Sequence, residues 1–382
     1  MTSGMRIHDI DTIQTADRVR ARATVTWENA SRPAAEVFIE TTRDQEEGFA
    51  ARPGAFLTGC LIPAMHFGEK RVSVEGNACP VLVENLASVM ALMRHWSAGA
   101  MQPLSIEPEG LCAGAAPNQP SGRPPRTGMV YSGGIDSIAT LRSNMLRYPA
   151  NHPGRIRECF FIHGFDIGGV VARGMKYPVF ERGFSAMKTV TGSAGTIPVP
   201  VYTNIRHLCD ERDLWLNYFF GAVLAAAGHS FSGRIDRFII ASSYDMDNLV
   251  PCGSHPMLDP WYSGLDMLVE HKDAHLRRID KLRITADWQP ALQNLRVCLA
   301  NVKDRLNCGI CEKCVRTMTG LLAIGGLHRT RAFVEDDVTP EMFSGFRITI
   351  RHRESFYEEL LPLLEERGRM DLADTIRQKL AE

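Results

Sequence analysis

The chain has 382 residues, 45% of them hydrophobic and 23% charged, which is ordinary for a folded protein and long enough for two domains. Its formal net charge of −1 and isoelectric point near 6.9 argue against a nucleic-acid partner, which a basic surface would attract. No apolar run reaches the about 18 residues of a membrane span, and ten cysteines are too few for a disulfide scaffold, so we expect a soluble, cytoplasmic protein.

Residues 1–100 carry short runs of β-branched and aromatic residues between proline and glycine breakers, a pattern typical of a small sheet. The expected strands are 23–27, 36–40 and 70–74, and the expected helix is 82–96. Apolar residues recur in the helical segment at close to 3.6-residue spacing, so this helix should cover the sheet. We therefore predict an N-terminal β-rich α+β domain.

No residue of this N-terminal part suggests catalysis. His66 and Cys60 are interpreted as packing or surface residues, because neither has a partner at metal-ligand spacing. Residues 101–127 are rich in proline, glycine, serine and alanine, with four prolines between 117 and 125. This composition predicts a linker between two domains.

A short apolar strand, 129–131, leads into the run Ser-Gly-Gly-Ile-Asp-Ser at 132–137 and then into a helix. Two adjacent glycines allow a tight turn close to a ligand, and the N–H groups of the new helix would bind an anion. The Asp136 carboxylate would be repelled by phosphate unless a divalent cation such as Mg²⁺ bridges the two. The run predicts a site for a nucleotide polyphosphate with magnesium. It is not a Walker A loop, because no Gly-Lys-Ser/Thr follows the glycines.

Downstream of this loop helices and strands alternate, which predicts a parallel sheet with helices on both faces. The expected elements are helix 137–148, strand 159–162, helix 179–191, strand 198–202, helix 214–228 and strand 237–241. Ligands bind at the carboxyl ends of strands in such sheets. The polar residues that follow the strands are therefore candidates for ligand binding: His163, Arg206, Ser243 and Asp245. His163 could instead satisfy a loop carbonyl, and Arg206 could be an ordinary surface arginine.

The segment 251–261 contains three prolines and few helix or strand formers. Long ordered loops often serve a function. This one could close over a substrate, with His255 or Asp259 as a hydrogen-bonding partner and Trp261 as an apolar wall. A proline-stiffened connector is the alternative interpretation.

Four cysteines in the last third of the chain have the spacing of a metal site: Cys298, Cys308, Cys311 and Cys314. Four thiolates fill a tetrahedral shell, so zinc bound there would be structural rather than catalytic. An iron–sulfur cluster is the alternative metal centre. Residues 331–382 should complete the chain as helices, with a break near Gly368.

The run at 132–137 resembles the PP-loop of the ATP pyrophosphatase family. Together with the four cysteines it resembles the 7-cyano-7-deazaguanine synthase family and its diverged relatives, over about residues 128–330. The resemblance implies an adenine nucleotide α-hydrolase-like fold that uses ATP, Mg²⁺ and Zn²⁺. The first gap between cysteines is one residue longer than in that family, and its members lack the N-terminal domain expected here.

The resemblance also implies roles for particular residues. Asp136 and Ser137 would be catalytic. The nucleotide would be bound by Tyr131, Ser132, Gly133, Gly134, Ile135, Asp136, Ser137, His163 and Arg206. The substrate would be bound by Ser243, Asp245, His255, Asp259 and Trp261.

Enzymes of that family adenylate the carboxylate of a deazaguanine, form an amide with ammonia, and dehydrate the amide to a nitrile with a second ATP. The resemblance therefore implies an ATP-dependent ligase that releases pyrophosphate and acts on a small-molecule carboxylate, with ammonia or a protein amine as acceptor. Two other interpretations stay open. A sulfur-transferring PP-loop enzyme acting on tRNA would need a reactive cysteine such as Cys252 or Cys209, and a nucleotide-sensing subunit of a defence system would need no chemistry. A homodimer is compatible with each of them.

Overall fold

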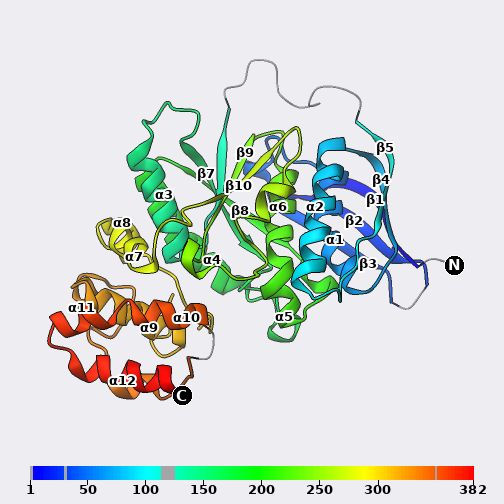
Figure 1. Cartoon of the computed structure of the whole chain (residues 1–382). Coiled ribbons are helices and arrows are strands. Elements are labelled where there is room, and N and C mark those ends of the chain that lie inside the picture. The colour runs from blue at the N-terminus through cyan, green and yellow to red at the C-terminus, as the bar shows by residue number, and fades with distance from the viewer. Residues whose placement is uncertain (1–2, 30–31, 113–124, 349–350) are drawn as a thin grey trace.

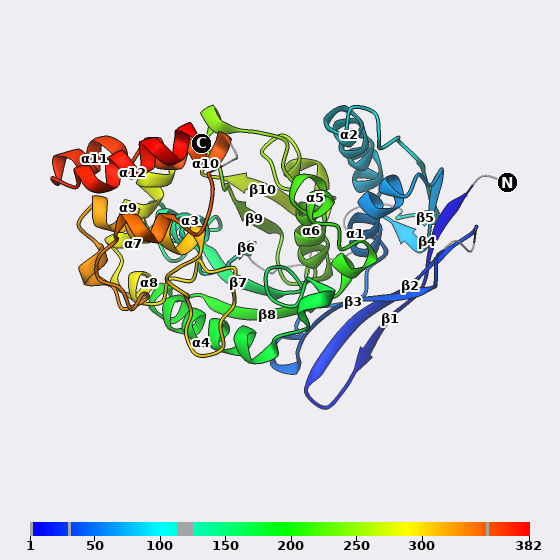
Figure 2. The same ribbon diagram turned by 90° about the horizontal axis from the view of Figure 1, so that it is seen from below.

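The computed structural model describes residues 3–29, 32–112, 125–348 and 351–382 of the chain. Within these residues ten strands form one sheet, in the order β10-β9-β6-β7-β8-β3-β2-β1-β4-β5, which runs across the molecule in Figures 1 and 2. Neighbouring strands are parallel except at β1–β2, β2–β3 and β3–β8. The strands are β1 (Gly4–Gln14), β2 (Arg18–Trp27), β3 (Ala35–Thr42), β4 (Arg71–Ala78), β5 (Ser105–Leu111), β6 (Thr127–Val130), β7 (Ile156–His163), β8 (Ile197–Thr203), β9 (Arg237–Ala241) and β10 (Leu268–Lys272).

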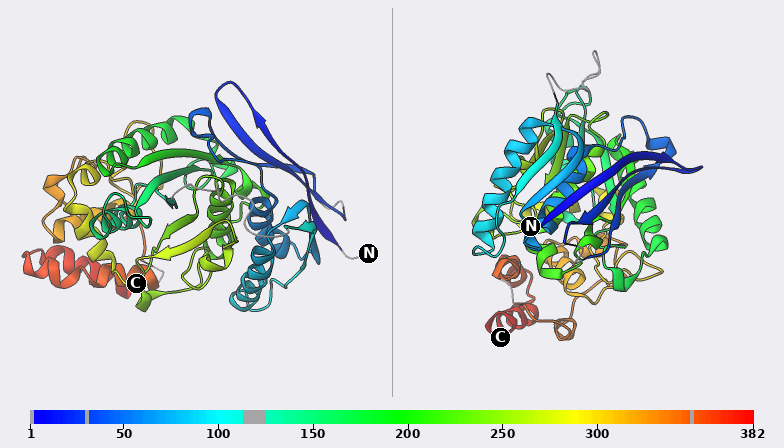
Figure 3. Two further views of the ribbon diagram at one scale, coloured as in Figure 1. Left: turned by 90° about the horizontal axis from the view of Figure 1, so that it is seen from above. Right: turned by 90° about the vertical axis from the view of Figure 1, so that its right-hand side faces the viewer.

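Helices cover both faces of the sheet (Figures 2 and 3). Helices α1, α2 and α6 pack in one hydrophobic core, and α3, α4, α7, α8, α9 and α12 pack in another. The protein is therefore an α/β protein, as the alternating pattern predicts. No helix in the described ranges is both long and apolar enough to cross a membrane. The helices are α1 (Pro53–His66), α2 (Pro80–Trp96), α3 (Ile135–Arg147), α4 (Tyr177–Ala194), α5 (Arg212–Leu214), α6 (Phe220–Ser230), α7 (Arg278–Ala286), α8 (Gln289–Gln293), α9 (Glu312–Ala323), α10 (Arg351–Glu358), α11 (Leu361–Glu366) and α12 (Met370–Ala381).

The elements from β6 to β9 match the expected strands and helices to within a few residues at most ends. The segment 214–228, expected as one helix, is divided into α5, a π-helical segment at Trp215–Phe219, and α6. The sequence pattern did not predict β10, α7 or α8. The first turn of α7 is mostly charged, so its apolar residues are too few to reveal a helical period.

The N-terminal strands do not form a separate small sheet, because β3 pairs with β8 and α1 packs against α6 in a shared core. The expected linker is also corrected in part, since Ser105–Leu111 forms the edge strand β5 beside β4. Pro108 lies within this strand. Proline has no backbone N–H to donate, and an edge strand tolerates this loss because one of its sides has no partner strand. Three prolines of the expected linker, Pro117, Pro120 and Pro124, lie outside the described residues.

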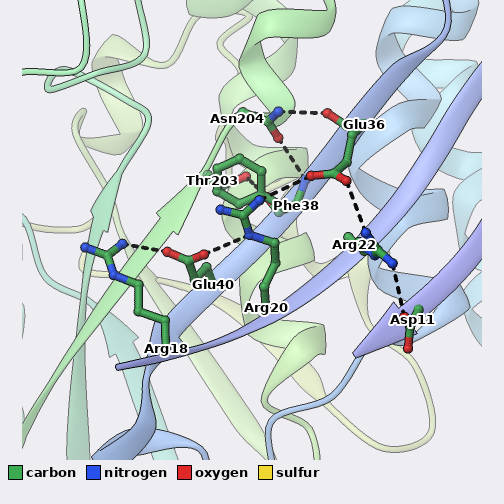
Figure 4. Close-up of polar contacts among 9 residues, drawn as sticks. All are labelled: Asp11, Arg18, Arg20, Arg22, Glu36, Phe38, Glu40, Thr203 and Asn204. Atoms are coloured by element: carbon green, nitrogen blue, oxygen red, sulfur yellow. Dashed lines mark hydrogen bonds and ion pairs between the residues drawn. The ribbon is translucent and has the colours of Figure 1, made fainter. Parts of the chain in front are cut away.

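The join between β3 and β8 is short and depends on side chains as well as backbone (Figure 4). The two strands pair antiparallel over three residue pairs. Beyond them, the Asn204 side chain accepts a hydrogen bond from the Phe38 N–H at 2.8 Å and donates one to the Glu36 carbonyl at 2.8 Å. The Thr203 hydroxyl donates to the Phe38 carbonyl at 2.7 Å. Side chains thus continue the pairing where the backbone ladder stops.

Arginines and acidic residues alternate on the outer face of β2 and β3 beside this join (Figure 4). The buried carboxylate of Glu40 accepts hydrogen bonds from Arg18 at 2.5 Å and from Arg20 at 2.8 Å. The Arg18 guanidinium also lies 3.9 Å from the ring centroid of Tyr202 on β8. Because the arginines are paired with acids, this face is balanced in charge and offers no basic strip to a polyanion.

The C-terminal helices pack around α9 in the same core as the four cysteines (Figure 1). Gly368 follows α11 with a φ of +71°, which confirms the expected break at that glycine. A second break separates α10 from α11, and Pro362 lies in the first turn of α11, where proline is tolerated.

Replacing Asn204 by alanine should lower the free energy of unfolding by about 1–3 kcal/mol, because the Phe38 N–H then loses its acceptor at the join. Chemical denaturation of both proteins measures this difference. Asn151 is exposed, so Asn151→Ala serves as the control and should change stability by less than about 0.5 kcal/mol. An equal effect of the two substitutions would show that the join does not depend on Asn204.

Candidate functional site

The loop at 132–137 connects β6 to α3 and is built around two serines and a glycine turn. Gly133 has a φ of +74°, and a Cβ there would lie 3.0 Å from the Met187 sulfur, so the position requires glycine. The Ser137 hydroxyl donates to the Gly134 carbonyl at 3.0 Å and lies 3.3 Å from the Ser132 hydroxyl. The turn is therefore held by its own side chains. The first N–H groups of α3 lack intrahelical acceptors and can bind an anion.

This loop lies at the point where the strand order reverses. Strand β6 has β7 on one side and β9 on the other, and all three are parallel. Helices α3 and α4 pack in one hydrophobic core, and α6 packs in the other. In open α/β sheets this switch point leaves a crevice at the carboxyl ends of the strands, which is where ligands bind.

Two cations from α7 face Asp136 at this end of the sheet. Arg278 donates to the Asp136 carboxylate at 2.8 Å, and the Lys281 Nζ lies 3.7 Å from the same oxygen. Burial alone would raise the pKa of Asp136, but the charges of Arg278 and Lys281 outweigh it and hold the pKa below its ordinary value. Lys281 is buried, and its Nζ donates a hydrogen bond of 2.6 Å to the carbonyl of Ser242, which follows β9. Lys281 therefore links the end of β9 to Asp136 on α3. Burial lowers the pKa of Lys281.

A small cavity lies next to these cations, between α7, α9 and the turn after α10, and its lining includes Arg278, Arg316, Phe356 and Glu359. Arg316 is buried, its guanidinium lies 4.9 Å from the ring centroid of Phe356, and burial lowers its pKa. One of its nitrogens lies 3.3 Å from Glu312, close enough for an ion pair but without hydrogen-bond geometry. Glu359 is desolvated here, which raises its pKa to about 7. Buried ionisable groups with shifted pKa values are typical of functional sites.

Sequence reasoning did not select Arg278, Lys281 or Glu359. All three lie far from the loop in the sequence. Arg278 and Lys281 are on α7, which has little hydrophobic pattern, and Glu359 is in the turn after α10. Only the packing of α7 against α3 brings the first two to Asp136. The sequence alone allows Arg316, two residues after Cys314, either a phosphate or a surface role. The structure buries it beside the cavity.

The loop 251–263 is ordered by contacts with the π-helical segment. The Gly253 N–H donates to the Leu216 carbonyl at 3.0 Å, and the Gly221 N–H donates to the Gly253 carbonyl at 2.8 Å. A Cβ on Gly221 would lie 2.0 Å from that carbonyl oxygen, so the close approach requires glycine. A π-helical segment leaves backbone groups without their usual helical partners, and here the loop uses the Leu216 carbonyl.

Asp259 organises the loop from inside. Its carboxylate is fully buried and accepts hydrogen bonds from the Ser254 hydroxyl at 2.7 Å, the His255 N–H at 3.2 Å and the His271 Nδ1 at 2.8 Å. His255 is also buried, with its ring 5.1 Å from that of Trp96, and burial lowers its pKa. These hydrogen bonds show that Asp259 and His255 stabilise the conformation of the loop.

Of the other candidate substrate residues, Ser243 and Trp261 lie at the surface and Asp245 is buried. Trp261 is 42% exposed, and Ser243 is exposed directly after β9. Asp245 is buried and accepts hydrogen bonds from the Asn248 side-chain amide at 2.8 and 3.0 Å. Ser243 and Trp261 are therefore open to a ligand from solvent, whereas Asp245 is already bonded within its turn.

His163 and Arg206 have protein partners after β7 and β8. The His163 ring is buried, its Nε2 lies 2.5 Å from the Met175 carbonyl, and it stacks on Tyr177, with burial lowering its pKa. Arg206 is buried and bonds Asp210 at 3.0 Å. Its guanidinium also donates to a backbone carbonyl at 3.0 Å and lies over a tryptophan ring. Both residues hold their loops in place in this structure.

Tyr131 and Ile135 lie beside the glycine turn of the loop at 132–137, and their side chains are fully buried in the core. Burial raises the pKa of the Tyr131 hydroxyl well above its ordinary value, so it stays protonated. These two residues can therefore meet a ligand only through their backbone, whereas the serines and Asp136 lie at the carboxyl edge of the sheet.

The four predicted cysteines converge. Their sulfurs all lie within 4.8 Å of one another: Cys298, Cys308, Cys311 and Cys314. The Cys311 sulfur lies 3.5 Å from that of Cys314, and the Cys311 N–H donates to the Cys308 sulfur at 3.3 Å. Four convergent thiols suit a tetrahedral ion, so the cluster could hold a metal such as zinc.

Asn307 fixes the two segments that supply these sulfurs. Its side chain accepts the N–H groups of Val297 and Cys298 at 2.8 and 3.2 Å and donates to the carbonyls of Leu295 and Ala332 at 2.8 and 2.9 Å. A fully bonded buried amide of this kind holds four backbone groups in one geometry. The cluster is therefore preorganised by the protein.

Comparison of the chain with models of protein families finds no match, and neither the characterised proteins nor the solved structures provide one. The class of the protein is therefore given by its fold and its cysteine cluster. The protein is an α/β protein built on a mostly parallel ten-stranded sheet, with a four-cysteine cluster that could hold a metal such as zinc.

Glu359→Gln should remove part of the pH dependence of stability. Because folding raises the pKa of Glu359 from 4.5 to about 7, its contribution is fully present below pH 4.5 and is lost as the pH rises through about 7. Relative to the variant, the wild-type protein should lose at most about 1.4 kcal/mol per pH unit in that window. Denaturation at a series of pH values measures this. Glu358→Gln, at an exposed neighbour, should keep the wild-type profile, and parallel profiles for wild type and Glu359→Gln would contradict the assignment.

Cys311→Ser should remove the bound metal and lower the temperature of unfolding, because a structural metal site contributes directly to folding. Elemental analysis of the desalted wild-type protein should find about one zinc per chain, and the variant should retain little. Cys252 lies outside the cluster, so Cys252→Ser should keep its zinc. Iron with acid-labile sulfide in the wild-type protein would show an iron–sulfur cluster instead.

Proposed function

We propose that this protein is an ATP-dependent ligase that adenylates a carboxylate, releases pyrophosphate, and passes the acyl group to an amine or to ammonia. The observation that carries the proposal is the convergence of Arg278 and Lys281 on Asp136, beside the glycine turn at the switch point of the sheet. A polyphosphate needs both N–H donors and cations, and this crevice supplies them from α3 and α7.

The chemistry suits such a crevice. A carboxylate is a poor acyl donor, because attack on it would have to expel an oxide. When its oxygen attacks the α-phosphorus of ATP, the bond to the β-phosphate oxygen breaks and pyrophosphate carries the electron pair away. The N–H groups of α3 and the cations of α7 would stabilise the charge that develops on that leaving group. No protein nucleophile is required.

Asp136 is the residue that would hold Mg²⁺, since it is the carboxylate of the phosphate loop. The ion would neutralise phosphate charge and orient the leaving pyrophosphate. In the structure the same carboxylate forms ion pairs with Arg278 and Lys281. These cations can turn to the phosphates when the carboxylate takes another partner.

In the second step an amine attacks the acyl carbon of the acyl adenylate, loses a proton and expels AMP. The combination of phosphate loop and cysteine cluster supports a 7-deazaguanine-like acid as the carboxylate, by resemblance to the 7-cyano-7-deazaguanine synthase family. Ser243 and Trp261 are the exposed candidates for contact with that substrate. The product would be an amide, or a nitrile after a second ATP-dependent dehydration.

Sulfur transfer to tRNA has less support. It needs a reactive thiolate, but burial raises the pKa of Cys252, and Cys209 is buried with its sulfur 3.6 Å from Glu211. The arginines of β2 are paired with acids, so that outer face would not attract RNA.

Asp136→Asn should reduce pyrophosphate release by at least about a hundredfold, because a neutral amide binds Mg²⁺ weakly and the lost interaction acts on the leaving group. Pyrophosphate release is measured with ATP and a panel of carboxylates that includes deazaguanine acids. Asp280→Asn changes an exposed aspartate of α7 that pairs with Arg283, and it should keep wild-type turnover. ATP binding without pyrophosphate release from any carboxylate would favour the sensing function instead, and unchanged turnover in Asp136→Asn would refute the ligase assignment.

A further inference from the structure

A second group of potential metal ligands lies away from the phosphate loop. It consists of His66, the last residue of α1, Cys209, which follows β8, and Glu211, which precedes α5. Strand β7 separates β8 from β6 in the sheet, so this group does not belong to the crevice at the switch point. The residues are far apart in the sequence, and only the packing of α1 near the end of β8 unites them.

The three ligand atoms converge. The Glu211 Oε1 lies 3.1 Å from the His66 Nε2 and 3.6 Å from the Cys209 sulfur, and all three atoms lie within 4.8 Å of one another. Ligands around a tetrahedral ion, at about 2.0–2.3 Å from its centre, are separated by about 3.3–3.8 Å. A small ion therefore fits with little movement of the His66 and Glu211 side chains, of which His66 is partly and Glu211 largely exposed.

The ligand types select the kind of ion. A thiolate and an imidazole favour zinc or cobalt over magnesium or calcium, which prefer oxygen. Three protein ligands leave the fourth tetrahedral position open to water or a small molecule, whereas the four-cysteine cluster is closed. The thiol proton of Cys209 would leave when the sulfur coordinates the ion.

One ligand of this group is buried in the core, and the other two are accessible from solvent. Cys209 is 5% exposed within the core, while the Glu211 side chain is 63% exposed and that of His66 is 29% exposed. Burial raises the pKa of the Cys209 thiol to about 11, and the charge of Arg32 acts against this shift. The Arg32 guanidinium lies 3.6 Å from the ring centroid of Phe67. This positive charge opposes a bound cation, so it limits the affinity of the site.

We propose that His66, Cys209 and Glu211 form a second metal site, which binds one zinc-like divalent ion and leaves one coordination position open. The site is independent of the proposed ligase activity, since none of its three residues belongs to the phosphate loop or to the four-cysteine cluster.

The test is a titration of the full-length protein, carrying one zinc in its four-cysteine cluster, with cobalt chloride. The wild-type protein should bind one further cobalt per chain and show thiolate-to-cobalt absorption while the zinc is retained. His66→Gln should weaken cobalt binding by at least about tenfold, since even the loss of an outer partner of a ligand costs about 10–100-fold. The exposed histidine of α2 provides the matched control, and His95→Gln should bind as the wild type does.

Two further variants sharpen the test. Cys209→Ser should abolish the thiolate-to-cobalt absorption, and Arg32→Gln should tighten cobalt binding because it removes a nearby positive charge. Absorption that appears only as zinc is released would arise from exchange at the four-cysteine cluster and would overturn the proposal. Unchanged cobalt affinity in His66→Gln would overturn it as well.

Discussion

Strand β6 lies between two parallel neighbours, and this position determines on which faces the helices lie and where the glycine turn stands. The chain passes from β6 through α3, β7 and α4 to β8 on one side, and later through α6 to β9 on the other. Because parallel crossovers are right-handed, extending the sheet in opposite directions puts the helices on opposite faces. The helices diverge at the end of β6, and this divergence opens the crevice that holds the glycine turn. The same crevice receives the cations of α7, which follows β10.

The N-terminal strands cover one edge of the sheet, that of β8. Without them β8 would be an edge strand with unpaired backbone groups, which invites association with other chains. Strand β3 covers that edge, and Asn204 extends the pairing with its side chain. Helix α1 then packs against α6, so one hydrophobic core crosses the join. The N-terminal part is thus integral to the folded unit.

The cysteine cluster connects the C-terminal helices to the crevice. Cys311 and Cys314 lie at the start of α9, and Arg316 follows within the same turn. A metal held by the four sulfurs would fix the start of this helix and therefore the direction of Arg316 toward the cavity beside α7. Such a metal would help to arrange the charges of the site indirectly, through the helix rather than through its own chemistry.

Features that depend on local spacing can be predicted from the amino-acid sequence. These are the glycine turn, the four-cysteine pattern, the alternation from β6 to β9 and the helix break at Gly368. Tertiary structure alone decided the features that need distant residues: the single sheet, the pairing of Asp136 with Arg278 and Lys281, the inward position of Asp259, and the meeting of His66 with Cys209. The reason is physical. A turn or a ligand spacing is set by a few successive backbone angles, whereas strand pairing and buried ion pairs are set by the packing of segments that lie far apart in the sequence.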